Sequence, residues 1–440
     1  MKKALAGLAL LATLAGAVVY GFAAHKWKLF PYRQLRAAYL KTRPVQQAHR
    51  VARSPGDASR KAQRDRIGAL TQLPYLQGYN PATNQRGVIV NDSARAFRGW
   101  NLAVSAHGAG AQLLDMSGAV HHRWALGIQS AWPDRKAGAD PTGYDQYWRR
   151  AELLPGGDLL VVWEYIGLAR IDRQSRLLWA SANGAHHDLA VSGDGTIYVL
   201  THEMKILPDI NPDDPVSEDF VTILKPDGQL VRKISLLTAF DRSDYAAALA
   251  PMQSEGDVLH ANSIQILDGS LAGRSPAFAA GNLLVSLRSL NIVAVLDPRA
   301  ERIVWSLSGL WRGQHAPRIL GNGRMLVFDN FGLARADSSR VLEIDPFSQE
   351  IAWRYGEGEG QAIFSESNGS AERLGNGNTL IVESNAGRAF EVTPGGEIVW
   401  EYLNPFRTGE KKDLVATLKQ LSRLDPGLPV DWAERPDGGP

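Results

Sequence analysis

Hydrophobic positions in this chain fall in short runs that recur together with the turns between them. From about residue 88 onward, each recurrence has a Gly-rich turn, a short apolar strand, a second strand ending in Asp or an equivalent residue, a turn, and a strand ending in Trp. The clearest copies span 153–179, 319–353 and 374–400, and weaker copies end at Trp124, Ile234 and Trp305. Trp305 and Trp353 are 48 residues apart, and Trp353 and Trp400 are 47 apart.

Six copies with this period predict an all-β fold, a six-bladed β-propeller over residues 85–407. One four-stranded unit cannot bury both of its faces, so neighbouring units pack face to face around a central axis. The recurring Trp is expected to fill the space between blades, and insertions fall in the third and fourth copies. A solenoid is the alternative, but its unpaired end strands make the closed ring the better prediction.

The repeat ends after Pro405. Residues 413–424 favour one amphipathic helix, and residues 425–440 are rich in Pro and Gly. Residues 408–440 are therefore expected to be a C-terminal helix and tail.

The N-terminus has the pattern of a membrane segment. Lys2 and Lys3 precede 21 uncharged residues, 4–24, close to the roughly 20 that cross a bilayer as a helix. Residues 1–24 are therefore predicted to be an uncleaved signal anchor, with a cleaved signal peptide as the alternative. Basic residues continue beyond the span and do not clearly orient it, but its layout favours export of the C-terminal part. Residues 25–84 are predicted to be a basic, partly helical stalk interrupted by proline.

Charge and cysteine content exclude several classes of function. Residues 1–66 contain 14 Lys and Arg and two acidic residues, whereas the whole chain has a net charge of only +2. The body is thus mildly acidic, which argues against a nucleic-acid partner. The chain has no cysteine, so it has neither a thiolate nucleophile nor a cysteine-ligated metal site.

Three histidines fall at matching places in successive repeats. His187 and His315 each stand eight residues before a turn glycine, and His260 begins the equivalent strand of the blade between them. Because the first strand of a propeller blade is the innermost, all three imidazoles are expected to approach the central channel from one end. Arg288 lies one strand after His260, where it either pairs with a carboxylate or offers its planar guanidinium to an oxyanion.

Three histidines and one arginine suit an anion better than other ligands. Three His can hold zinc, but the sequence places no nearby carboxylate clearly to support them, and the arginine would repel a cation. A serine hydrolase of the elbow type is excluded because no Gly-x-Ser-x-Gly occurs. With an anionic group, one His can act as nucleophile or base while the other cations stabilise the transferring oxygens.

The same residues resemble those of a known family. The resemblance to the bacterial arylsulfotransferase (arylsulfate sulfotransferase) family covers about residues 85–407 and lies in residues 88–126, His186-His187-Asp188-Leu189, 257–264, Val285-Ser286-Leu287-Arg288, Gln314-His315-Ala316-Pro317 and 376–381. The ordered set of motifs is more specific than any one of them.

The resemblance implies a periplasmic enzyme that moves a sulfuryl group from a phenolic sulfate ester to a phenol or other hydroxyl acceptor. It implies no nucleotide sulfate donor and no cofactor or metal. It also implies that His315 is transiently sulfated and that His187, His260 and Arg288 bind the sulfuryl group. The expected location is the inner membrane, through a single span, with the propeller in the periplasm.

This chain departs from the family pattern in three ways, one of which is that it lacks the cysteines that some members pair. Residues 25–85 leave no room for the family's N-terminal β-sandwich, and Ala316 stands where an acidic residue often follows the nucleophile. A membrane-anchored, non-catalytic propeller that serves as a binding or assembly module is the alternative function. A quinone-dependent dehydrogenase is disfavoured because no calcium-binding carboxylate set is evident.

Overall fold

The computed structural model describes residues 78, 80–136, 138–140, 143–332, 338–409, 411–430, 432 and 433. The chain divides into two compact units, Met1–Arg66 and Ile67–Pro440, and every described residue belongs to the second. The predicted membrane segment and most of the predicted stalk therefore lie outside the described residues. In the part that the structure describes, no helix is long and apolar enough to cross a membrane.

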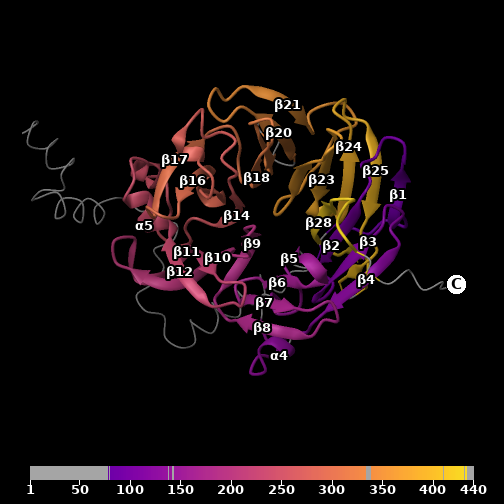
Figure 1. Cartoon of the computed structure of the whole chain (residues 1–440), viewed down its shortest axis with the longest axis horizontal. Coiled ribbons are helices and arrows are strands. Elements are labelled where there is room, and N and C mark those ends of the chain that lie inside the picture. The colour runs from indigo at the N-terminus through magenta and orange to yellow at the C-terminus, as the bar shows by residue number, and fades with distance from the viewer. Residues whose placement is uncertain are drawn as a thin grey trace, which may run out of the picture. The chain divides into compact units, whose positions relative to one another are not determined.

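The described strands form six blades around a central axis, each built on four antiparallel strands (Figure 1). From the innermost strand outward, blade 1 consists of β28 (Leu418–Leu424), β2 (Trp100–Ser105), β3 (Gly110–Leu114) and β4 (Val120–Ala125). Blade 2 consists of β5 (Arg150–Leu153), β6 (Leu159–Trp163), β7 (Gly167–Ile171) and β8 (Leu177–Ser181). Blade 3 consists of β9 (Ala185–Val191), β10 (Ile197–Leu207), β11 (Asn211–Leu224) and β12 (Leu230–Ser235).

The remaining blades repeat this order. Blade 4 consists of β14 (Ala261–Ile266), β15 (Leu283–Leu287), β16 (Ile292–Asp297) and β17 (Arg302–Ser308). Blade 5 consists of β18 (His315–Ile319), β19 (Met325–Asp329), β20 (Arg340–Ile344) and β21 (Ile351–Tyr355). Blade 6 consists of β22 (Ser370–Arg373), β23 (Thr379–Glu383), β24 (Arg388–Val392) and β25 (Ile398–Leu403). The prediction of a six-bladed propeller is confirmed, and the solenoid alternative is wrong.

Short elements decorate the ring. The additional strands are β1 (Gly87–Asn91), β13 (Gly256–Asp257), β26 (Arg407–Thr408) and β27 (Leu414–Val415). The helices are α4 (Ile128–Ala131), α5 (Leu236–Asp241) and the 3-10 turns η2 (Pro155–Gly157), η3 (Ala246–Leu249), η4 (Pro276–Phe278), η5 (Arg288–Leu290) and η6 (Ser384–Ala386). α5, η3 and β13 lie between blades 3 and 4, and η4 lies within blade 4, at the predicted insertions.

Both ends of the repeat region close the ring. β28 is the innermost strand of blade 1, where it pairs with β2 from Trp100↔Leu424 to Ser105↔Leu418. β1 pairs with β25 at the outer edge of blade 6. The helix predicted over 413–424 is therefore wrong, and propeller strands extend beyond residue 407. Blade 1 has no inner strand of its own, so the backbone groups of β2 require this C-terminal segment in an extended form.

The recurring Trp residues lie between blades, but their burial differs. Trp124 and Trp400 are fully buried, whereas Trp179 and Trp353 are half-buried. Each of the four indole N–H groups donates to a turn carbonyl of the neighbouring blade; the acceptors are Gly157, Met116, Pro226 and Pro394 respectively. The repeat thus marks a polar contact as well as an apolar one.

The antiparallel order of each blade determines which residues meet at one end. The innermost strand starts where the second strand ends, so the start of β9, β14 or β18 lies beside the turn between the second and third strands of its blade. All the predicted site residues occupy this end, which we call the histidine end.

Candidate functional site

Backbone irregularities shape the inner strands at the histidine end. In blade 3, residues 186–188 lie opposite the single residue Leu200, and in blade 5 residues 316 and 317 lie opposite Val327. His187, His260 and Ala316 all have left-handed backbone conformations, with φ of 54°, 55° and 48°. Non-glycine residues in this region store strain, which often accompanies a functional site.

The three histidines therefore share an end of the fold but not one register. His187 lies inside the bulge of β9, His260 directly precedes β14, and His315 is the first residue of β18. The expectation of strictly equivalent positions needs this correction. The irregular backbone shifts the start of each inner strand by a different amount. His187 and His260 are nevertheless in ring contact although their registers differ.

His187 and His260 are in direct ring contact. Their ring centroids are 4.8 Å apart with planes at 73°. The Nδ1 atom of His260 is 2.6 Å from the Oδ2 atom of Asp257, and the His260 side chain is 22% exposed. His260 is thus accessible from the channel mouth while a carboxylate holds one of its nitrogens.

His315 is buried and held through one nitrogen. Its Nδ1 atom is 3.0 Å from the Gly313 carbonyl oxygen and 2.7 Å from the Oδ1 atom of Asn330. Its Nε2 atom makes no hydrogen bond to any described residue. The ring is thereby fixed in orientation with one nitrogen left for chemistry.

Burial and nearby positive charge keep two of the imidazoles neutral. Burial lowers the pKa of His315 well below its usual value, and the charge of Arg288 lowers it further. Burial likewise lowers the pKa of His187, with further lowering from His260 and Arg149. Electrostatic interactions thus link His315 to Arg288 and His260, and His187 to His260 and His315. At neutral pH, His315 is therefore an unprotonated imidazole among cations.

Arg288 is the cation that the sequence predicted for this site. It begins η5, and its backbone N–H donates to the His260 carbonyl oxygen at 3.0 Å. Burial lowers the pKa of its guanidinium, which the charges of Glu366 and Asp257 partly offset. Among the described residues, no carboxylate lies within ion-pair distance of this guanidinium. Of the two predicted uses of Arg288, the structure thus gives no support to the carboxylate pair.

Several site residues were missed in the sequence. Glu164 lies in the second turn of blade 2, where its two carboxylate oxygens are 3.1 Å from His187 Nδ1 and 3.2 Å from Arg149 Nε. The neighbouring Tyr165 has its ring centroid 5.9 Å from that of His187. Glu164 and Tyr165 occupy the same turn of their blade as Arg288 and Asn330 do in theirs. Comparing that turn across the repeats could have identified them.

Asp188 holds the inner strands together just below the histidines. Its carboxylate is 3.1 Å from Arg150 on β5 and 2.8 Å from Arg318 on β18, and it accepts the Ile264 N–H of β14 at 3.1 Å. One buried carboxylate thus joins four blades directly beneath His187. This layer fixes the separation of the strands that carry the site.

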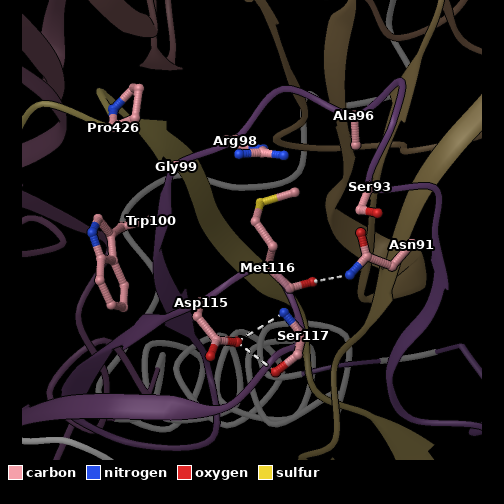
Figure 2. A pocket seen from close by; sticks show the side chains of 10 residues that line it. All are labelled: Asn91, Ser93, Ala96, Arg98, Gly99, Trp100, Asp115, Met116, Ser117 and Pro426. Atoms are coloured by element: carbon pink, nitrogen blue, oxygen red, sulfur yellow. Dashed lines mark hydrogen bonds between the residues drawn. The ribbon is translucent and has the colours of Figure 1, made fainter.

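A pocket at the opposite end is not part of this site. It has a volume of about 500 Å³, and the end of β1, the start of β2 and the turn between β3 and β4 line it. Figure 2 shows Arg98, Trp100 and Met116 among its lining residues. In the described ranges, this site included, no three His, Asp or Glu side chains are arranged to hold a metal ion.

Comparisons with known proteins give a family and a distant fold likeness. The model of a family described as arylsulfotransferase (ASST) matches residues 150–405. No curated protein sequence matches the chain.

Solved structures resemble the chain only distantly. A Bacteroides caccae protein of unknown function is 14% identical with a TM-score of 0.48, over 74% of this chain and 98% of its own. A catalytically inactive virginiamycin B lyase from Staphylococcus aureus, solved with quinupristin, is 12% identical with a TM-score of 0.41, over 74% of this chain and 87% of its own. BamB from Moraxella catarrhalis is 12% identical with a TM-score of 0.33, over 74% of this chain and 83% of its own.

Proposed function

The chain belongs to the arylsulfotransferase family, whose model matches more than half of it, and we propose that it transfers a sulfuryl group through a sulfohistidine at His315. The family makes it an aryl-sulfate sulfotransferase. The proposal adds the covalent intermediate, the roles of the site residues and the class of donor and acceptor. The donor is a phenolic sulfate ester, and the acceptor is a phenol or another hydroxyl compound.

In the first half-reaction, the Nε2 lone pair of His315 attacks the sulfur of the donor. An N–S bond forms, the S–O bond to the aryl group breaks, and the phenolate leaves with the electron pair. Arg288, whose guanidinium has no ion pair to a described residue, offers it to the sulfuryl oxygens, over which negative charge spreads as in phosphoryl transfer. His187, which contacts the ring of His260, lines the same site as a neutral imidazole.

Protonation of the leaving phenolate needs a group that is accessible and able to change charge. His260 is better placed than His187 because it is partly exposed and Asp257 holds its Nδ1. In the second half-reaction, the acceptor hydroxyl returns a proton to His260 and its oxygen attacks sulfur. The N–S bond then breaks and neutral His315 is regenerated, which predicts ping-pong kinetics.

The observation that carries this proposal is the neutral, buried His315, which has one nitrogen held and the other without a hydrogen bond to any described residue, under the charge of Arg288, which has no ion pair among the described residues. A neutral imidazole under the charge of one arginine that has no ion pair to a described residue suits attack on an anionic sulfate ester. A non-catalytic binding module does not require an unpartnered buried nitrogen.

The test uses p-nitrophenyl sulfate with a panel of phenols. Wild-type protein quenched after incubation with the donor alone should carry one added sulfuryl group on His315, detected by mass spectrometry. His315→Ala should remove transfer and labelling without loss of fold, while the matched control His122→Ala, in blade 1, should keep both. Full transfer by His315→Ala would rule out the covalent mechanism.

We further propose that residues 4–24 anchor the chain in the inner membrane with the propeller in the periplasm. The 21-residue uncharged run and the family resemblance support this location. Protease treatment of spheroplasts should digest the propeller, and protection of the propeller would contradict the proposed orientation.

A further inference from the structure

Asn330 is a fully buried residue that lies between His315 and the segment leading into blade 6. It follows β19, its Oδ1 atom is 2.7 Å from His315 Nδ1, and its amide nitrogen donates to the carbonyls of Ser365 and Asn368 at 2.8 and 2.7 Å. The Ser339 hydroxyl donates to the Asn330 carbonyl oxygen at 2.7 Å. These contacts use both amide hydrogens and fix the side chain.

The hydrogen-bond network determines which nitrogen of His315 carries the proton. Because both amide hydrogens of Asn330 go to carbonyl oxygens, its Oδ1 must face His315 and can only accept. A flipped amide would place oxygen against two carbonyl oxygens. The Gly313 carbonyl, also near Nδ1, is a second acceptor. Nδ1 is therefore the N–H of the neutral ring, and Nε2 holds the lone pair.

We propose that Asn330 is a positioning residue that holds His315 in the Nδ1–H tautomer and so presents the Nε2 lone pair to the sulfuryl group. The inference rests on the proposed role of His315 as nucleophile. It identifies Nε2 as the reacting atom of His315 and attributes this choice to Asn330, which lies outside the sequence motifs.

The chemical identity of the Nδ1 partner separates His260 from His315. His260 faces the carboxylate of Asp257, whereas His315 faces a neutral amide and a carbonyl. The Nδ1 atom of His187 is 2.9 Å from the Nδ1 atom of its neighbour His186. A carboxylate stabilises imidazolium and suits a ring that gains protons. A neutral acceptor fixes the tautomer without favouring protonation, so the partners of His315 suit a ring that must keep its lone pair.

One test reads the tautomer directly in the wild-type protein. Full-length protein with ¹⁵N-labelled histidine is examined by two-bond ¹H–¹⁵N correlation at neutral pH, and the signals of His315 are identified by their loss in His315→Gln. The expected spectrum shows a protonated Nδ1 and a bare Nε2. A protonated Nε2 in the neutral ring would overturn the proposal, whether or not any substrate is found.

The second test adds a negative charge at the same place. The burst of p-nitrophenol released from p-nitrophenyl sulfate, measured per folded molecule against pH, reports the protonation of His315. Asn330→Asp retains an acceptor but should move the acidic limb of this profile to higher pH by about one unit or more. The matched control Asn404→Asp changes another fully buried amide, which donates to Ser105 and Ala416 in the closure region. It should lower stability without moving the limb.

The two tests distinguish failure of the inference from failure of the proposed function. If wild-type protein gives no burst with any aryl sulfate, the proposed function fails. If wild-type protein gives a burst and Asn330→Asp keeps the wild-type limb and amplitude, the positioning role is wrong. If Asn330→Asp does not fold, the tautomer spectrum of the wild type decides.

Discussion

Replacement of Arg288 by Lys distinguishes between two roles of this residue, binding of the sulfuryl group and stabilisation of the fold. Lys keeps the positive charge but loses the planar, two-pronged geometry that matches two sulfuryl oxygens. Loss of one such oxyanion donor typically costs about 2–4 kcal/mol in the barrier, or roughly 30- to 900-fold in turnover. The guanidinium has no ion pair to any described residue, so stability should change by no more than about 0.5 kcal/mol.

The matched control is Arg423→Lys. The Arg423 side chain is fully buried, its Nη1 is 3.0 Å from Glu391, and its Nε donates to Asn101 at 2.7 Å. Losing these bonds should lower stability by about 2 kcal/mol or more. Turnover per folded molecule should not change.

The assay is the rate of p-nitrophenol release with saturating acceptor, divided by the folded fraction from a melting curve of the same sample. Arg288→Lys should lose turnover at an unchanged Tm, and Arg423→Lys should do the reverse. Wild-type turnover per folded molecule in Arg288→Lys would refute the assignment of Arg288 to the site.

Three further outcomes follow from burial and charge. Burial is the main cause of the lowered folded-state pKa of His315 and His187, so the stability they contribute is present above pH of about 6.5 and is lost as the pH falls below that value. Calorimetry should show that the Tm of His187→Gln falls less steeply with acidification than the Tm of the wild type, and an equal fall would mean that this ring is not buried in its neutral form. Burial raises the pKa of Asp188, but Arg318 and Arg150 lower it by more, so the stability that this carboxylate contributes is present above pH of about 4 and is lost as the pH falls below that. Asp188→Asn should therefore lower the free energy of unfolding by about 3–5 kcal/mol in chemical denaturation at pH 7, and a loss under about 1 kcal/mol would contradict its joining role. Trp353 is only half-buried, with one indole hydrogen bond of 2.9 Å, so Trp353→Ala should cost about 1–3 kcal/mol; an unchanged Tm would show that it does not join blades 5 and 6.

The site shows how a propeller brings distant residues together. Each blade contributes only the start of its inner strand and one adjacent turn to the histidine end. Blade 3 supplies His187, the segment before blade 4 supplies Asp257 and His260, blade 4 supplies Arg288, and blade 5 supplies His315. Bulges and left-handed residues at the strand starts then determine how closely these groups approach.

The sequence by itself determined the fold class and the residues with the most visible chemistry. Recurring Trp and turn glycines carry the blade period, because every blade must pack against its neighbours in the same way. His187, His260, His315 and Arg288 could be selected because repeat phase assigns them to the innermost strand and the turn beside it. A local pattern suffices where each blade repeats the same contact.

Only the tertiary structure decided the closure of the ring and the partners of the histidines. Residues 418–424 form a strand because their partner, β2, lies more than 300 residues earlier, and a short apolar pattern cannot reveal such a pairing. Asn330 and Glu164 lie in turns without a distinguishing motif, and their importance comes from contacts with His315 and His187. Long-range contact geometry sets a ring's tautomer and charge, and a linear sequence does not contain that geometry.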